Sequence, residues 1–218
     1  MSFSERSLDY LFEICSRNDR EWYHANKAEY KTVLQDPMTE VAEALRESMA
    51  AIDPLMTYRI SRIYRDARTL RGRPFFRDHV WLSYDRDHDL YNGLPSFFFE
   101  VDPTGFRYGL GYYYASRQSL EAMRELILSR DETWEEAFQA YNDQKVFTLA
   151  GESYKRNHYP NEPEAVCDWL NRKNLFLIAE SRDYDLLFSS RLSEKLAKDF
   201  TAVKAVYWFM MKMESAWR

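Results

Sequence analysis

The sequence predicts an α+β fold, in which a largely antiparallel central sheet is packed by N-terminal, middle and long C-terminal helices. Apolar residues recur at helical spacing in the first fifty residues and again in the second half of the chain. Between them lie aromatic and β-branched runs that turn residues separate, as in hairpin strands. Helices that flank such strands are typical of α+β folds. The 218 residues hold no linker-like segment, so we expect one domain over residues 1–218.

The first fifty residues are predicted to form a helical layer. From Ser4 to Arg17 the apolar residues follow the stripe of an amphipathic helix. Asn18 and Asp19 interrupt that stripe, and Asp19 can cap a second helix. The Asp36-Pro37 pair is predicted to open a third helix, because a capping acid followed by proline is a common helix start.

Four strands are predicted in the middle of the chain, at residues 58–64, 80–84, 96–101 and 106–114. The turn sequence at residues 102–105, Asp-Pro-Thr-Gly, predicts antiparallel pairing of the last two strands. The Asn92-Gly93 dipeptide is predicted to turn the chain between the second and third. The centre of the chain is therefore predicted to form a β-meander of successive strands.

Two aromatic triplets lie within these strands, at residues 97–99 and 112–114. They could offer stacking surfaces to bases or sugars, as aromatic sheets do in RNA-binding modules. In a strand, however, the middle residue of a triplet points away from its neighbours. The favoured interpretation is a sheet with aromatic residues on both faces, each packed under helices. The glycines at positions 109 and 111 form no nucleotide-binding motif and indicate a bulge or a close backbone approach.

The second half of the chain is predicted to be mostly helical. Helical spacing covers residues 119–129, resumes after Asp131, and returns in a shorter helix that Pro163 opens. A further strand is predicted at residues 175–179. One long helix from Leu192 to Trp217 is expected to close the chain.

Composition excludes several classes of protein. Apolar runs are far shorter than the roughly 20 residues of a membrane span. The N-terminus lacks the features of a secretory signal, and Cys15 and Cys167 form no CxxC pair, so we expect a cytoplasmic protein with reduced, buried thiols. The net charge of −5 disfavours non-specific binding to nucleic acid. The sequence leaves the cofactor and the oligomeric partner unknown.

An arginine cluster is the most unusual feature of the chain. Seven arginines, no lysine and one acid lie within residues 59–77, which gives the segment a charge of +6 and leaves −11 on the rest. Because the planar guanidinium group suits phosphate and carboxylate, the cluster is typical of specific anion binding. Five of the arginines recur at every third position, which matches neither a helix nor a strand, so they cannot share one face. The arginines are Arg59, Arg62, Arg65, Arg68, Arg71, Arg73 and Arg77.

Two interpretations of the cluster remain open. In the first, Arg62, Arg65 and Arg68 bind a small molecule that carries phosphate or carboxylate, and Asp66 orients two of them or acts as a catalytic base. In the second, neighbouring acids neutralise the same arginines, and the domain is structural or binds another protein without catalysis. For Asp66 itself, an internal ion pair is the favoured interpretation. Whether any reaction follows is left open.

Two sequence blocks resemble an uncharacterised family, domain-of-unknown-function family 2461. The first runs N-D-R-E-W-Y from residue 18 and includes Asn26, Lys27 and Tyr30; the second runs R-I-Y-R-D-A-R over residues 62–68. The family pattern is approximately N-x-R-E-W-F-x-x-N-K-x-x-Y followed by R-I-x-R-D-x-R-F-S-K-D-K. Residues 69–73, T-L-R-G-R, depart from its last five positions. The resemblance covers most of the chain and implies no known activity.

The first block also supplies candidate ligand-binding residues. Asn26 lies four residues from both Trp22 and Tyr30, on one helical face. It either ties the helix to backbone elsewhere in the chain, which is the favoured interpretation, or orients a ligand. Arg20 and Lys27 are seven residues apart and could extend the basic surface, although a solvated face is the ordinary interpretation. For metal, the acids and histidines at positions 79 and 85–89 match no established motif, so we predict no metal site.

Overall fold

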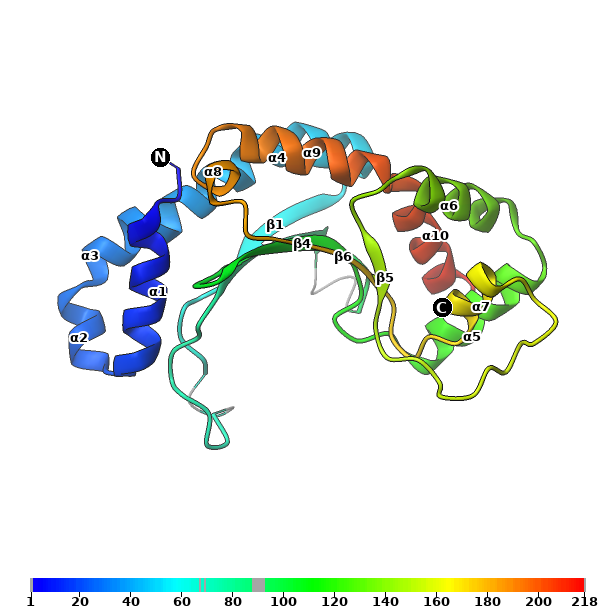
Figure 1. The fold of residues 1–218 in the computed structure, drawn as a ribbon, viewed down its shortest axis with the longest axis horizontal. Helices are drawn as coiled ribbons and strands as arrows, with labels where there is room; N and C mark the ends of the chain where they lie inside the picture. Colours follow the sequence, from blue (N-terminus) through cyan, green and yellow to red (C-terminus); the bar gives the residue numbers. More distant parts are fainter. Residues whose placement is uncertain (1, 67, 69, 88–92, 218) are drawn as a thin grey trace.

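A computed structural model describes residues 2–66, 68, 70–87 and 93–217 of the chain. It shows an arch (Figure 1), with helices at both ends and a sheet between them. The predicted residues Ala67, Thr69, His88, Asp89 and Asn92 lie outside the described part. The α+β class is confirmed, because helices surround a single antiparallel sheet. No helix in the described ranges is both long and apolar enough to cross a membrane.

The N-terminal helices begin at one end of the arch, and the last of them runs over the sheet (Figure 1). They are α1 (Glu5–Arg17), α2 (Arg20–Ala25), α3 (Lys27–Tyr30), the π-helical turn η1 (Lys31–Gln35) and α4 (Asp36–Ile52). The capping role of Asp19 is confirmed, since its side chain accepts hydrogen bonds from the backbone N–H groups of Glu21 and Trp22. The predicted helix start at the Asp36-Pro37 pair is confirmed, since α4 begins at Asp36 with Pro37 in its first turn, but Asp36 lies within the helix rather than at its cap. Asp36 is helical, with φ −65° and ψ −48°, and α4 continues from η1 without interruption.

The sheet has the order β1-β2-β3-β4-β6-β5, and every neighbouring pair is antiparallel. The first four strands form the predicted meander, although β1 begins earlier and ends at Ile60 rather than Tyr64. The turn at residues 102–105 joins β3 to β4 as predicted. The short β5 was not predicted. The strands are β1 (Met56–Ile60), β2 (Val80–Arg86), β3 (Ser96–Asp102), β4 (Gly105–Gly111), β5 (Thr148–Ala150) and β6 (Phe176–Ser181).

The predicted close backbone approach at the β4 glycines is confirmed. A Cβ atom added at Gly109 would lie 2.0 Å from the backbone oxygen of Leu177. A side chain at this position would therefore force β4 and β6 apart.

The C-terminal half holds six helices within the described residues: α5 (Arg117–Leu128), α6 (Glu132–Asp143), α7 (Glu164–Leu170), α8 (Tyr184–Leu187), α9 (Arg191–Ala202) and α10 (Lys204–Ser215). As predicted, α6 begins after Asp131 and Pro163 precedes α7; the side chain of Asp131 also caps α6. The prediction of a single long C-terminal helix is wrong. Val203, with φ −110° and ψ 18°, separates α9 from α10. The break lets α9 pack on α4 while α10 packs between α5 and α6 at the other end of the arch.

Helices cover one face of the sheet. The hydroxyl of Tyr84 donates to the backbone oxygen of Ala42 in α4, and that of Tyr108 donates to Asp199 in α9. The buried Phe97 ring packs on Phe200 and Tyr207 from α9 and α10. This face forms the floor of the hydrophobic core beneath α4 and α9 (Figure 1).

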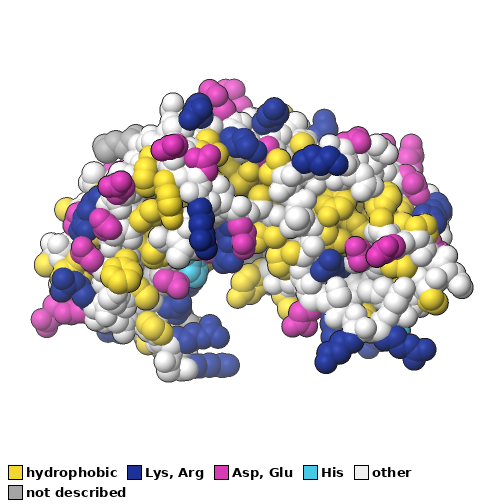
Figure 2. Space-filling view, in the orientation of Figure 1, with side chains coloured by type: hydrophobic (Ala, Val, Ile, Leu, Met, Phe, Trp, Pro, Cys, Tyr) yellow, Lys and Arg dark blue, Asp and Glu magenta, His cyan; other side chains and the backbone are white. Residues whose placement is uncertain are grey.

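The opposite face of the sheet is open, which corrects the prediction of two helix-covered faces. Trp81, Ser83 and Phe98 alternate with buried residues along β2 and β3, and each is partly exposed. Past the end of β4, Tyr113 and Tyr114 are 102% and 79% exposed. An alternating sequence pattern places neighbouring residues on opposite faces of a sheet, but it does not show whether helices cover both faces. The open face lines the hollow of the arch (Figure 2).

Candidate anion-binding pocket

The arginine segment folds back on itself as a hairpin beneath β1, at residues 62–79. A β-bridge joins Tyr64 to Phe76, the backbone N–H of Arg65 donates to Phe75 O at 2.8 Å, and that of Arg77 donates to Ile63 O at 2.8 Å. These bonds hold the two arms of the hairpin in register. The hairpin lies below the sheet, beside the N-terminal helices (Figure 1).

Asn18 fastens this hairpin to the N-terminal helices. Its Oδ1 accepts hydrogen bonds from the backbone N–H groups of Phe75, at 2.8 Å, and Phe76, at 3.2 Å. Asn18 can aim its side chain there because it ends α1 in the left-handed conformation, with φ 47°, which asparagine tolerates better than most residues. The apolar pattern around Asn18 predicts only a helix break there. Its position at the start of the first family block was the signal that could have revealed this role.

A pocket of about 440 Å³ lies between the N-terminal helices and the hairpin. We call it the N-terminal pocket. Both family blocks line it, and its lining contains Arg20, His24, Lys27 and Arg62 but no acid among the described residues. The full lining is Arg20, Tyr23, His24, Lys27, Tyr30, Gln35, Ile60, Ser61, Arg62, Ile63, Tyr64 and Phe75.

Three of the predicted ligand-binding residues therefore meet in one place: Arg20, Lys27 and Arg62. All three are exposed at the pocket, and within the described part of the chain none forms an ion pair with an acid. Arg20 instead rests on Phe75, with its guanidinium carbon 4.0 Å from the ring centroid. This contact positions the planar fork at the pocket while leaving its N–H donors available for an anion.

Aromatic side chains form the rest of the wall. The rings of Tyr64 and Phe75 stack at 5.8 Å, and Tyr23 packs edge-on against both Tyr30 and Tyr64. Burial raises the pKa of Tyr30 to about 12, against an opposing backbone hydrogen bond from Ile63. Tyr30 is therefore a neutral hydroxyl at pH 7. The pocket combines a cationic rim with a weakly polar, aromatic interior.

The other predicted arginines lie elsewhere. Arg65 turns away from the pocket, and its Nη1 donates to the backbone oxygens of Pro74, at 3.0 Å, and Phe76. Arg59 forms an ion pair with Asp85 at 2.6 Å. Arg68 forms one with Asp66 at 2.6 Å, on the exposed hairpin. As predicted from their spacing at every third position, the arginines do not share one face.

Asp66 is placed poorly for catalysis. It does not line the pocket. The hydrogen bond from the Arg68 side chain holds the pKa of Asp66 below its usual value, with smaller contributions from the Arg68 backbone and the charge of Arg62. A carboxylate held in this way is a weaker base than a free one.

Asn26 lies outside the pocket lining and stabilises the helix. Its Nδ2 donates to the backbone oxygen of Trp22 at 2.8 Å, and its own backbone oxygen accepts from the Tyr10 hydroxyl at 3.3 Å. The favoured prediction was a tie to backbone elsewhere in the chain, whereas the side chain bonds the backbone of the helix that it ends.

The acid and histidine group at the end of β2 is partly described. Asp85 accepts from Arg59, and His79 Nδ1 lies 2.7 Å from Asp78 Oδ1. His88 and Asp89 fall outside the described residues. Within the ranges that the structure describes, no group of His, Cys, Asp and Glu could hold a metal ion. Both cysteines are free; Cys167 is buried as predicted, whereas Cys15 is partly exposed.

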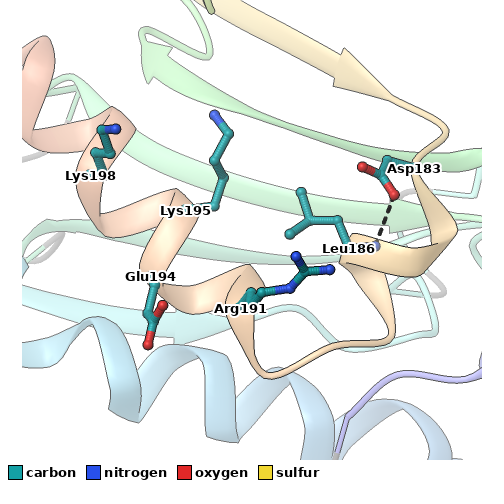
Figure 3. A pocket seen from close by; sticks show the side chains of 6 residues that line it. All are labelled: Asp183, Leu186, Arg191, Glu194, Lys195 and Lys198. Carbon is teal, nitrogen blue, oxygen red and sulfur yellow. Dashed lines mark hydrogen bonds between the residues drawn. The ribbon is translucent and has the colours of Figure 1, made fainter.

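A second depression, of about 340 Å³, lies between α8 and α9 on the helical side of the molecule (Figure 3). Its lining mixes charges, with Asp183 and Glu194 beside Arg191, Lys195 and Lys198. Two of these are already engaged: Lys195 pairs with Asp199, and Asp183 accepts from the backbone N–H of Leu186 at 2.9 Å. Because its cations have acids of their own nearby, this depression is a weaker anion site than the N-terminal pocket.

The model of one protein family, described as conserved hypothetical protein (DUF2461), matches residues 6–209. The chain belongs to the DUF2461 family. The match confirms the resemblance that the two blocks indicated, and residues of both blocks line one pocket. No curated protein matches the chain. The family description carries no activity, so the function must be argued from the site.

Proposed function

We propose that this protein binds a small molecule that carries a phosphate or carboxylate group, in the N-terminal pocket. The observation that carries the proposal is the convergence of Arg20, Lys27 and Arg62 on a pocket without an acid in its described lining. Like charges that are brought together repel each other, and a bound anion relieves that repulsion. Guanidinium groups also recognise phosphate and carboxylate through paired hydrogen bonds.

Binding is favoured over catalysis. Asp66, the candidate base, is engaged by Arg68 outside the pocket lining. The lining offers the His24 imidazole and the hydroxyls of Tyr23, Tyr30, Tyr64 and Ser61. No contact between them forms a nucleophile–base pair in the described part of the chain. The proposed role is therefore recognition of an anionic ligand.

The alternative is a structural or protein-interaction domain whose arginines are neutralised internally. Arg59 and Arg68 fit this alternative, since each pairs with an acid. Arg20 and Arg62 do not fit it, because neither forms an ion pair with an acid among the described residues. The alternative therefore applies to a part of the cluster that the pocket does not use.

Thermal melts with inorganic phosphate, sulfate and succinate test the proposal. A ligand at 100 times its dissociation constant adds about 2.7 kcal/mol to stability. For a chain of this size we expect the melting temperature to rise by roughly 5 to 10 °C. Flat melts with the whole panel would contradict the proposal.

Variants locate the ligand. Replacing Arg62 or Lys27 by Ala is expected to weaken binding by roughly 10- to 150-fold, because a hydrogen bond to a charged group contributes about 1.5 to 3 kcal/mol. Arg68→Ala is the matched control, since it removes a hairpin arginine outside the pocket lining. If Arg62→Ala instead destabilises the ligand-free protein and leaves any ligand shift intact, Arg62 is structural and the proposal fails.

A further inference from the structure

The buried tyrosines of this protein fall into two groups, according to whether the hydroxyl has an acceptor in the protein. Seven tyrosines are buried within the described part of the chain. Two of them, Tyr23 and Tyr30, donate to no oxygen among the described residues. A buried tyrosine hydroxyl usually finds a hydrogen-bond partner, so these two are the exceptions. The five that donate to a backbone or carboxylate oxygen are Tyr10, Tyr84, Tyr108, Tyr112 and Tyr207.

Both exceptions line the N-terminal pocket, whereas none of the five engaged tyrosines does. Tyr23 and Tyr30 are 7% and 8% exposed, so the pocket is where their remaining accessible surface lies. The Tyr23 oxygen is not among the described side-chain atoms that are sealed inside the protein without a partner, and it therefore opens to the pocket. The two hydroxyls without an acceptor in the protein thus occur at the cavity for which we propose a ligand.

Tyr30 supplies a donor whose direction is fixed. Its phenolic oxygen accepts a hydrogen bond from the backbone N–H of Ile63, in the hairpin. Burial raises the pKa of Tyr30 to about 12, so the hydroxyl keeps its proton at pH 7. A hydroxyl that already accepts one hydrogen bond can still donate another. An oxygen atom of a ligand in the pocket would be the acceptor.

The organic part of the ligand follows from the pair of tyrosines. Their ring centroids are 5.8 Å apart, in edge-to-face contact, and burial raises the pKa of Tyr23 as well, so both are neutral hydroxyls. Alcohol groups match such hydroxyls, because an alcohol both donates and accepts. The pocket volume of about 440 Å³ lies within the range of small-molecule sites, roughly 300 to 1,000 Å³, so an inorganic anion alone does not fill it.

We propose that the ligand of the N-terminal pocket is a sugar phosphate, whose hydroxyl groups exchange hydrogen bonds with Tyr23 and Tyr30. Its phosphate contacts the cationic rim of Arg20, Lys27 and Arg62. The inference rests on the proposed function, since it names the class of the same ligand. A phosphate monoester suits three cations better than a carboxylate does, because its charge at pH 7 is about −1.5 to −2.

Isothermal titration calorimetry with four probes tests the proposal: inorganic phosphate, phenyl phosphate, ribose 5-phosphate and glucose 6-phosphate. The last three are monoesters of similar charge, and phenyl phosphate is the one without hydroxyl groups. At least one sugar phosphate is expected to bind about 5- to 150-fold more tightly than phenyl phosphate, which is what two hydrogen bonds would provide.

Tyr30→Phe and Tyr23→Phe each remove a hydroxyl and keep the ring. Each is expected to weaken binding of the sugar phosphate by about 2- to 12-fold and to leave binding of phenyl phosphate unchanged. Because the Tyr23 hydroxyl has no described partner, Tyr23→Phe should not lower the melting temperature of the ligand-free protein. Tyr10→Phe is the matched control. Its hydroxyl donates to Asn26 O at 3.3 Å outside the pocket lining, so the preference for sugar phosphate should stay at the wild-type value.

The outcomes separate this inference from the proposed function. Inorganic phosphate that binds the wild type and not Arg62→Ala establishes the anion site by itself. The sugar phosphate is then overturned if neither sugar phosphate binds more tightly than phenyl phosphate, or if Tyr23→Phe and Tyr30→Phe both keep the wild-type preference. If no probe binds at about 10 mM, a concentration well above ordinary specific affinities, the proposed function fails and this inference fails with it.

Discussion

Two arginine environments in this protein contrast sharply. On the covered side of the sheet, Arg86 donates through Nε to Asp53 Oδ2 at 2.7 Å, and Tyr207 donates to the same oxygen at 2.6 Å. At the hairpin, Arg20 and Arg62 have no acid partner among the described residues. The first arrangement joins α4, β2 and α10 and is complete without a ligand. We propose that a bound anion completes the second, so this contrast separates the structural arginines from the proposed ligand-binding ones.

The largest expected effect comes from breaking the covered arrangement. Asp53→Ala leaves Arg86 partly buried without its acid, and loss of one partner of a buried pair costs about 3 to 5 kcal/mol. Urea denaturation should show this loss as a lower transition midpoint. If the midpoint stays unchanged, the covered pair is not structural and the comparison fails.

Asn18→Ala is expected to have the next largest effect. It leaves the backbone N–H groups of Phe75 and Phe76 without their acceptor, at roughly 1 to 3 kcal/mol for each group that stays out of water. Because the hairpin arm would also loosen, affinity at the N-terminal pocket should fall. Melts with and without ligand measure both effects. Asn18→Asp, which keeps an acceptor oxygen, is the matched control and should retain the hairpin contacts.

Low pH should reduce the stability that Asp53 contributes on the covered side of the sheet. Burial raises the pKa of Asp53, but hydrogen bonds from Arg86 and Tyr207 outweigh it and leave the pKa below its usual value. A carboxyl with a lowered folded pKa stabilises the fold above its unfolded pKa, about 3.9, and loses that contribution as pH falls through the lower folded pKa. Melts between pH 7 and pH 2 should show a smaller loss for Asp53→Asn than for the wild type. Equal losses would show that Asp53 contributes nothing to the acid transition.

The smallest expected effect is that of Arg68→Ala. The Arg68–Asp66 pair is exposed, and such pairs contribute little to stability. Neither the melting temperature nor ligand binding should change measurably. A clear loss of binding would extend the site toward the hairpin tip and weaken the distinction drawn above.

Local signals were enough to predict much of the fold. Asp19 and Asp131 cap helices, and the turn at residues 102–105 joins two strands, because each acts through bonds to neighbours in the chain. Distant packing decided the features that were missed. Val203 ends α9 although nothing in its residue type breaks a helix, and β5 is too short to show a pattern.

The candidate site could be predicted only in part. Residue type and spacing identified Arg20, Lys27 and Arg62, which line the pocket. They could not separate these from Arg65 and Arg68, because the direction of each side chain depends on how the hairpin folds back. The contacts of Asn18 and the open face of the sheet required the arrangement of the whole chain, although the first family block marked Asn18 as a residue of interest. One-dimensional patterns record which residues are chemically able to bind, and the fold decides which of them are left unpaired.

The π-helical turn η1 sets the rotational phase of the N-terminal end. In this turn the backbone N–H of Asp36 donates to Lys31 O, five residues back, which accommodates one residue more than an α-helical turn. Each residue of an α-helix advances it by about 100°. Deleting one residue from this turn would swing Arg20 and Lys27 around the axis of α4 by about that angle, away from Arg62. The extra residue of this turn therefore sets how Arg20 and Lys27, on the N-terminal helices, face Arg62 on the hairpin.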